Sequence, residues 1–338
     1  MKEQIIQQLK QNKTVLIASH TSPDGDAIGS LIALGLTLEK FGKKVVLYNE
    51  GPIPAVYRFL PQTDRVLCAL EPDAFFDIAI VLDCSTLQRI GAAAETVKLT
   101  PVTINIDHHV TNTGFGDFQI IDAKACASAE IVYELIKKLG VAIDAAIATS
   151  IYTGIFTDTG SFRFANTNLA AFAICNEMVQ LGADPYCVSK NVYGAYSLNR
   201  IKLLNQALDT IEISQDGKLS MMVLTQAMMS KTGTQSEDVE GIINYARRIE
   251  DVKMAVLIHE LKNGHKHKPA CAPHPYHVSL RGNGNVDVAS IAADFGGGGH
   301  HDAAGFNIES TLADIKNKIL NLEIGDVNSE FGILNSES

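Results

Sequence analysis

The sequence has no tryptophan, no long hydrophobic run and no closely spaced pair of cysteines. Its nearest approach to a membrane span, residues 145–156, falls short of the roughly 20 apolar residues that a spanning helix needs. The six cysteines are scattered without a C-x-x-C pair, which is typical of reduced thiols. The N-terminal segment MKEQIIQQLKQN lacks the apolar core of a signal peptide. We therefore expect a cytoplasmic protein that has no membrane partner.

Positive charge is also scarce, since 28 Lys and Arg stand against 38 Asp and Glu, for a net charge of −10. This balance argues against a protein that neutralises many phosphates along a long nucleic-acid duplex. It is compatible with a short nucleotide held by metal ions and a few basic residues, because carboxylates are ligands for hard cations.

Apolar residues, in contrast, are plentiful. Hydrophobic residues make up 46% of the chain and charged residues 20%, as in ordinary globular proteins. A chain of 338 residues is long enough for two domains, each with a core of its own.

Strand-like and helix-like patterns alternate through the first half of the chain. Helical patterns cover residues 28–41 and 130–139, and the second of these stops at Gly140. Four compact apolar runs indicate strands buried on both faces: residues 14–19, 44–49, 77–83 and 102–107. The alternation predicts an α/β fold with a mostly parallel sheet and helices on both of its faces.

After Gly182 the pattern changes to a second, smaller α/β unit. Residues 197–208 have helical spacing, and strand candidates follow at residues 220–225, 254–260 and 277–281. The predicted organisation is a catalytic domain over residues 1–185, a helical linker over 186–210, a second domain over 211–328 and a tail over 329–338.

Four short segments place polar, metal-type ligands directly after an apolar run. They contain His20, Asp24 and Asp26 in SHTSPDGDAIGS, Asp83 in IVLDCS, Asp107, His108 and His109 in INIDHHV, and Asp158 in GIFTDTGSF. In open α/β sheets the carboxyl ends of the strands form the crevice where ligands bind. These side chains are therefore expected to converge.

Each segment also has a simpler explanation on its own. The aspartates could cap helices or turns, and the histidine pair could be an ordinary hydrogen-bonded pair. Together these explanations are hard to sustain, because converging carboxylates raise one another's pKa unless cations neutralise them. The sequence thus predicts a metal centre.

The order of these motifs resembles the DHH phosphoesterase superfamily: H-x-x-x-D-x-D, then D after a strand, then D-H-H, then a later D. GGGGHHDAAGF, at residues 296–306, and SLRGNG, at residues 279–284, resemble the accessory DHHA1 domain. The resemblance extends over about residues 10–325. The two-domain layout is most similar to the bifunctional oligoribonuclease and pAp phosphatase branch, the nanoRNases.

The resemblance implies two divalent ions. One would be held by His20, Asp24 and Asp83, and the other by Asp26, Asp83, His108 and Asp158, so that Asp83 bridges them. Mixed imidazole and carboxylate ligands suit Mn²⁺ better than Ca²⁺ or Mg²⁺. His109 would face the substrate phosphate beside the catalytic Asp83, and Asp107 would orient His108 or a neighbouring residue.

For the C-terminal motif, the resemblance implies a substrate-binding site. Glycines let the backbone approach an anion closely, and an arginine grips phosphate with two donors. The implied residues are Arg281, Gly297, Gly298, Gly299 and His300. A glycine run alone is more often a flexible loop.

The stretch 265–277 does not fit this pattern. It contains His265, His267, Cys271, His274 and His277, so that a second metal site is conceivable. Its three prolines favour an exposed loop.

The predicted function is metal-dependent hydrolysis of short oligoribonucleotides to mononucleotides and of pAp to AMP. Other hydrolases of the superfamily remain alternatives, including soluble cyclic or linear dinucleotide phosphodiesterases, family II pyrophosphatases and exopolyphosphatase-like enzymes. The basic S-R-K-K-Q signature of the pyrophosphatases is absent. A nucleotide-binding regulatory module would lack one of the ligands, and none is missing. A homodimer is compatible with the sequence.

Overall fold

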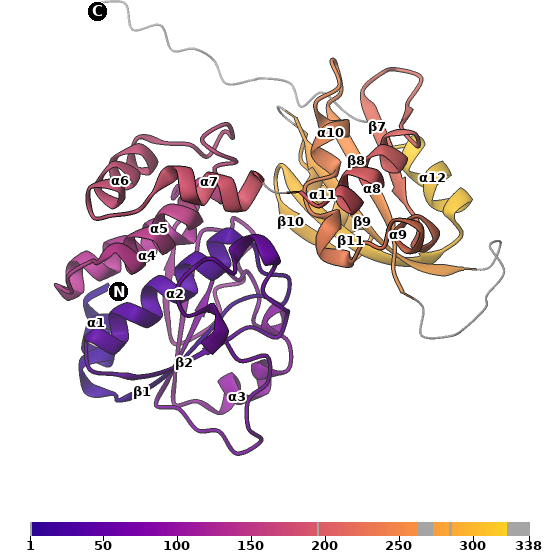
Figure 1. The fold of residues 1–338 in the computed structure, drawn as a ribbon. Coiled ribbons are helices and arrows are strands. Elements are labelled where there is room, and N and C mark those ends of the chain that lie inside the picture. The colour runs from indigo at the N-terminus through magenta and orange to yellow at the C-terminus, as the bar shows by residue number, and fades with distance from the viewer. Residues whose placement is uncertain (1, 195, 263–272, 284–285, 323–338) are drawn as a thin grey trace, which may run out of the picture. The chain divides into compact units, whose positions relative to one another are not determined.

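The computed structural model describes residues 2–194, 196–262, 273–283 and 286–322. The chain divides into two compact units, Met1–Ala195 and Tyr196–Ser338. Each unit has its own sheet, as Figure 1 shows. Each also has its own hydrophobic core. None of the helices in these ranges combines the length and the hydropathy needed to cross a bilayer.

The first unit consists of a five-stranded sheet and the helices that cover it. The strands are β1 (Thr14–Ala18), β2 (Lys44–Tyr48), β3 (Ile78–Leu82), β4 (Val102–Asp107) and β5 (Phe118–Ile121). The helices are α1 (Lys2–Gln11), α2 (Gly25–Lys40), α3 (Ala93–Leu99), α4 (Ser128–Leu139), α5 (Ala145–Asp158), α6 (Leu169–Gln180) and α7 (Pro185–Tyr193).

This sheet is parallel throughout, in the order β2-β1-β3-β4-β5. Its side chains alternate between two cores. Val15 and Ile17 pack with α2, α4 and α5, whereas Leu16 and Ala18 pack on the opposite face with α3. Because both faces are covered, most strand positions are apolar and the strands appear as compact runs in the sequence, although β4 also buries Thr103, Asn105 and Asp107.

Two helix boundaries matter for the position of the polar residues. Helix α2 begins at Gly25, three residues earlier than its apolar pattern, because Asp24 caps it by accepting a hydrogen bond from Ala27 N. Helix α4 begins at Ser128 rather than 130 and ends, as expected, at Gly140 in the left-handed conformation.

The second unit is built on a mixed sheet in the order β10-β11-β9-β8-β7-β6. Its strands are β6 (Glu212–Ile213), β7 (Leu219–Leu224), β8 (Met254–Glu260), β9 (His274–Gly282), β10 (Gly298–His300) and β11 (Ala303–Ser310). Its helices are α8 (Leu198–Leu208), α9 (Gln226–Thr232), α10 (Ile243–Arg247), α11 (Val288–Asp294) and α12 (Leu312–Leu320). Helices α8, α9 and α10 pack on one face, and α11 and α12 pack on the other.

The predicted fold class is confirmed: a parallel α/β unit precedes a smaller α/β unit. The two helices that fall within the predicted linker, residues 186–210, pack into different units. Val188 and Val192 of α7 belong to the first core, whereas Leu203 and Ala207 of α8 belong to the second. The predicted tail, residues 329–338, lies outside the described residues.

Candidate metal centre

The polar residues singled out in the first unit meet at one edge of its sheet. His20 follows β1, Asp83 follows β3, and Asp107 ends β4, with His108 directly after it. These three strands are parallel neighbours, so that their carboxyl ends share an edge. Helix α5 ends at Asp158 on the same side.

Three overlapping groups of side chains offer ligand atoms that lie within 4.8 Å of one another. They are His20, Asp24 and Asp83; Asp26, His108 and Asp158; and Asp83, His108 and His109. Asp83 and His108 each belong to two groups. All the residues predicted to bind metal are thus brought together.

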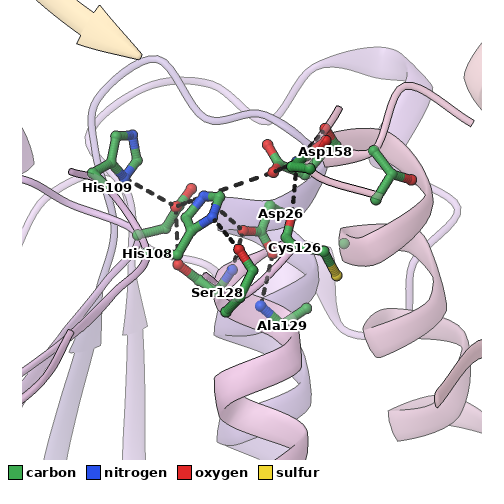
Figure 2. Close-up of polar contacts among 12 residues, drawn as sticks. Asp26, His108, His109, Cys126, Ser128, Ala129 and Asp158 are labelled. Carbon is green, nitrogen blue, oxygen red and sulfur yellow. Dashed lines mark hydrogen bonds and ion pairs between the residues drawn. The ribbon is translucent and has the colours of Figure 1, made fainter. Parts of the chain in front are cut away.

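His108 lies among the carboxylates. Its Nε2 is 3.7 Å from a carboxylate oxygen of Asp83, 3.7 Å from one of Asp158 and 3.9 Å from one of Asp26. The other ring nitrogen, Nδ1, contacts the backbone oxygen of Ala125 at 3.2 Å. Figure 2 shows the His108 ring facing Asp26 and Asp158, with His109 set apart. A backbone acceptor at Nδ1 favours the tautomer whose Nε2 can bind a metal.

Asp83 has an unusual backbone conformation. Its φ of +54° lies in the left-handed region, which few residues other than glycine adopt. Its amide donates to Ile106 O of the neighbouring strand at 2.9 Å, and Ser128 Oγ donates to its Oδ1 at 3.0 Å. Backbone strain of this kind persists where surrounding contacts enforce it and is common at functional sites.

Asp26 is fixed by the start of α4. The amides of Ser128 and Ala129 donate to its two carboxylate oxygens at 2.6 and 2.9 Å (Figure 2). A helix N-terminus offers unpaired N–H groups and a positive dipole end, so it holds a carboxylate well. Ser128 was not anticipated from the sequence, although a serine at the start of a helix is a pattern that could have singled it out.

Asp107 orients the second histidine of the D-H-H motif. Its Oδ1 lies 2.6 Å from His109 Nδ1, and its Oδ2 accepts a hydrogen bond from Asn112 Nδ2. The Asn112 amide also reaches the backbone oxygen of Cys84, at 3.2 Å. Asp107 lies in none of the three ligand groups and sets the orientation of His109. Asn112 was not anticipated, since a lone asparagine in a loop carries little signal.

Asp158 is held in a similar way by Asn166. The Asn166 Nδ2 donates to Asp158 Oδ2 at 2.9 Å and to the backbone oxygen of Cys126, also at 2.9 Å. This side chain ties the loop after α5 to the segment before α4, and it was likewise missed.

The charges at this edge perturb one another strongly. Burial raises the pKa of Asp26 well above its usual value, and the charges of Asp83 and Asp158 raise it further. Burial, opposed by His108, raises the pKa of Asp158 to about 7. Burial also acts to raise the pKa of Asp83. The hydrogen bond with His20 and the charges of the nearby imidazoles outweigh this effect and hold the pKa of Asp83 well below its usual range. The pKa of His108 rises to about 10, because the carboxylates around it outweigh the effect of burial.

The donor set fits divalent cations. Four carboxylates and three imidazoles converge, and one of these imidazoles, His20, has a buried Nδ1 with no hydrogen-bond partner in the described ranges. Buried anions that repel one another need positive charge beyond what the imidazoles provide. Oxygen and nitrogen donors together suit a first-row divalent metal.

The predicted substrate residues of the second unit lie on adjacent strands. Arg281 on β9 pairs with Ala303 on β11, which pairs with His300 on β10. The glycine run is structured in this unit, since Gly298, Gly299 and His300 form β10.

Close packing explains two of these glycines. A Cβ on Gly297 would lie 2.2 Å from Gly305 O, and one on Gly299 would lie 2.5 Å from Ala303 O. A Cβ on Gly298 would meet nothing within 4 Å. The backbone of β10 thus approaches β11 more closely than any side chain would permit at 297 and 299.

The unusual stretch 265–277 is described only in part. His265, His267 and Cys271 lie outside the described residues, whereas His274 and His277 belong to β9. His277 Nδ1 contacts Asn307 Oδ1 at 2.7 Å. Among the described residues, every group of three or more metal-type ligands lies in the first unit.

Comparison with known proteins agrees with the fold. Residues 14–155 match the model of the DHH family, N-terminal domain, and residues 220–323 match that of the DHHA1 domain. The chain therefore belongs to the DHH family of phosphoesterases and carries a DHHA1 domain.

Within this family, the chain is similar to proteins named bifunctional oligoribonuclease and PAP phosphatase NrnA. It is 32% identical over 300 residues to that of Thermus thermophilus, covering 89% of this chain and 86% of the relative. It is 26% identical over 316 residues to that of Bacillus subtilis, covering 92% and 94%. The predicted resemblance to this branch is confirmed.

A solved structure is similar over nearly the whole length. The exopolyphosphatase-related protein from Bacteroides fragilis matches with a TM-score of 0.84 and 26% identity, covering 94% of this chain and 95% of that one.

Proposed function

We propose that this phosphoesterase hydrolyses short oligoribonucleotides to mononucleotides and removes the 3′-phosphate of pAp to leave AMP. Two divalent ions, with Mn²⁺ the best match to the donors, would be its cofactors. The relatives named as oligoribonuclease and PAP phosphatase support the substrate class. The net charge of −10 supports short substrates over long duplexes.

The observation that carries this proposal is the sharing of Asp83 and His108 between groups of ligands. One ion would be held by His20, Asp24 and Asp83, and the other by Asp26, Asp83, His108 and Asp158. Two ions that share a ligand can activate a water molecule for attack on phosphorus and screen the charge that develops on the phosphoryl oxygens.

The protein's own residues orient and stabilise this centre. Ser128 and Asn166 fix the carboxylates of Asp26, Asp83 and Asp158, so that little reorganisation is needed when substrate binds. The hydrogen bond to Asp107 raises the pKa of His109 despite its burial, which favours the imidazolium. A charged His109 can hold a phosphoryl oxygen.

Selectivity for short chains is assigned to the second unit. Arg281, Gly297, Gly298, Gly299 and His300 are proposed to grip the terminal phosphate or end of the nucleotide. A guanidinium binds phosphate with two parallel donors, and backbone amides beside glycines can point at an anion.

A substrate panel tests the function. With Mn²⁺ present, the protein should hydrolyse a 5′-labelled RNA dimer and trimer and pAp much faster than a 24-mer, pyrophosphate or cyclic di-AMP. Asp83→Ala protein, purified in parallel, controls for contaminating nucleases. Preference for pyrophosphate or cyclic di-AMP over both RNA and pAp would refute the assignment.

A second candidate function is hydrolysis of inorganic polyphosphate, which the same substrate panel can test. Because the similar structure from Bacteroides fragilis is titled exopolyphosphatase-related, inorganic polyphosphate is included. Polyphosphate hydrolysis faster than trinucleotide hydrolysis would favour that alternative.

A further inference from the structure

A second arginine lies beside Arg281 in the DHHA1 unit. Arg247 ends helix α10, and this helix packs on strand β8, where Ala246 and Ala255 share a core. Ala255 is the register partner of Arg281 on β9. Directly paired residues of neighbouring strands project to the same face of a sheet, so that Arg281 lies on the face covered by α10.

The alternation along β9 supports this placement. Tyr276, Val278 and Leu280 pack into the core with α11 and α12 on the opposite face. Side chains at every second position share a face, which places Arg281 and Asn283 away from that core and toward α10.

The side chain of Asn283 forms hydrogen bonds with both the side chain and the backbone of Arg247. The Oδ1 of Asn283 accepts a hydrogen bond from Arg247 Nε at 2.8 Å, and its Nδ2 donates to Arg247 O at 2.8 Å and to Val252 O at 2.9 Å. The Asn283 amide in turn donates to Lys253 O at 2.7 Å. Because a guanidinium is planar, a bond at Nε sets the direction of the whole group.

The positive charges of Arg247 and Arg281 repel each other. Burial lowers the pKa of Arg247 from its usual value, the carboxylate of Asp302 counteracts this, and the charge of Arg281 lowers the pKa further. Two like charges held close together are stabilised by a bound anion. The register partners of Arg281 across the sheet, Ala255 and Ala303, are small and carry no charge.

We propose that Arg247 is a second phosphate-binding residue of the DHHA1 unit, acting beside Arg281 and positioned by Asn283. This inference rests on the proposed function, since the phosphate is taken to belong to a short nucleotide. Nothing in the sequence singled out Arg247: it is one of two consecutive arginines, and its neighbour Arg248 is exposed.

Binding to the full chain, treated with chelator to prevent turnover, tests the proposal by calorimetry. The probes are pAp and inorganic phosphate. The variants are Arg247→Gln, Arg247→Lys, Arg281→Ala, Asn283→Ala and the matched control Arg248→Gln. Thermal unfolding of each variant checks that the fold is retained.

Arg247→Gln should weaken pAp binding about 10- to 100-fold, as expected for loss of a charge-assisted phosphate contact. The affinity of Arg247→Lys for pAp should lie between those of the parent and of Arg247→Gln, because lysine keeps the charge but lacks the planar guanidinium. Arg248→Gln should bind within about twofold of the parent. The combined loss in an Arg247→Gln/Arg281→Ala double variant should be smaller than the product of the single losses, because both residues act on one phosphate.

Asn283→Ala should weaken binding about three- to tenfold in the parent but have no further effect in the Arg247→Gln background. A merely structural asparagine would weaken binding equally in both backgrounds. That result would show that Asn283 does not act by positioning Arg247.

Binding of pAp within twofold of the parent by folded Arg247→Gln would overturn the proposal, even if RNA and pAp are hydrolysed as expected. Conversely, a parent that hydrolyses neither substrate but binds phosphate in an Arg247-dependent way would refute the proposed function and leave the anion site standing. If Arg247→Gln fails to fold, Arg247→Lys decides: affinity for pAp equal to that of the parent would overturn the proposal.

Discussion

At the scale of single residues, Asp83 combines three properties seldom found together. It is buried, its backbone is left-handed, and its carboxylate belongs to two of the three ligand groups. A cap needs only one of its oxygens and none of this strain. The combination indicates a residue kept for chemistry rather than for stability.

Replacing Asp83 by Ala should damage both proposed ion sites at once. We expect turnover of a trinucleotide to fall on the order of 10³-fold or more, since removal of one member of a catalytic unit usually costs most of the rate. Steady-state kinetics and bound-metal analysis measure the effect.

Asp122→Ala is the matched control for this variant. Asp122 follows strand β5 of the same sheet, is exposed, and lies in none of the three ligand groups. It should keep near-normal turnover. Near-normal turnover in Asp83→Ala as well would reduce Asp83 to a structural residue.

Asp158 predicts a pH effect in the protein without metal. Its pKa of about 7, against a usual value of 3.8, means that between these values the folded state holds a proton that the unfolded chain has released. The contribution of Asp158 to the free energy of unfolding therefore falls as pH rises through this window. Chelator-treated Asp158→Asn should gain stability relative to the parent from about pH 4 upward, and the difference should level off above about pH 7.

Urea unfolding of both proteins at several pH values measures this difference. Added Mn²⁺ should reverse the ranking at neutral pH, because the ion binds the ionised carboxylate that asparagine lacks. Parallel pH curves for the two proteins without metal would contradict the assignment.

At the scale of elements, close helix packing brings the carboxylates together. A Cβ on Gly29 of α2 would lie 2.5 Å from Ser150 O of α5, and one on Gly154 would lie 2.9 Å from Asp26 Oδ1. The two helices thus meet backbone to backbone. This contact brings Asp26, in the first turn of α2, close to Asp158 at the end of α5.

Gly29→Ala should therefore separate the two carboxylates. The clash with backbone has no flexible side chain to absorb it, so we expect a destabilisation of about 1–3 kcal/mol. Turnover should fall roughly 10- to 100-fold, because catalysis is sensitive to displacements of about 1 Å. Thermal unfolding and kinetics on the trinucleotide test both effects.

Gly35→Ala, on the same helix, is the control. Its Cβ would meet the end of the Leu47 side chain, which can move. Alanine also favours the helix by up to about 1 kcal/mol over glycine. Equal losses in the two variants would show that α2 simply does not tolerate substitution.

At the scale of the whole molecule, the candidate functional residues fall into two sets, one in each unit. The ligand groups lie in the first unit, and the glycine run with its arginines lies in the second. The proposed function assigns catalysis to the first unit and choice of substrate to the second.

The variant Arg281→Ala tests whether substrate recognition by the second unit is separate from catalysis by the first. Turnover of the trinucleotide and of pAp should fall about 10- to 150-fold, as for a lost contact of roughly 1.5–3 kcal/mol to a charged group. Bis-p-nitrophenyl phosphate, which offers the second unit little to hold, should suffer much less, and bound metal should be unchanged. If all three rates stay within twofold of the parent, Arg281 has no part in recognition.

Metal removal should abolish hydrolysis of every substrate. Excess EDTA followed by dialysis should remove activity, and Mn²⁺ should restore it better than Ca²⁺, which prefers larger all-oxygen sites. Mn²⁺ at about 100 times its dissociation constant should also stabilise the fold by about 2.7 kcal/mol, seen as a higher Tm. Asp83→Ala should show a smaller shift, and full activity in EDTA would refute metal catalysis.

The sequence by itself predicted strands β1 to β4 and β7 to β9, the fold class and the residues gathered at the sheet edge, whereas β5, β6, β10 and β11 were not predicted. Strands buried on both faces are mostly apolar, so that charged residues and histidines at the ends of such runs stand out, as Asp83 and His108 do. Only the tertiary structure decided which side chains orient them. Ser128 and Asn166 make contacts with residues remote in sequence, which no local pattern encodes. The exact start of α4 and the closeness of α2 to α5 also could not be predicted from the sequence, because packing rather than helix propensity sets them.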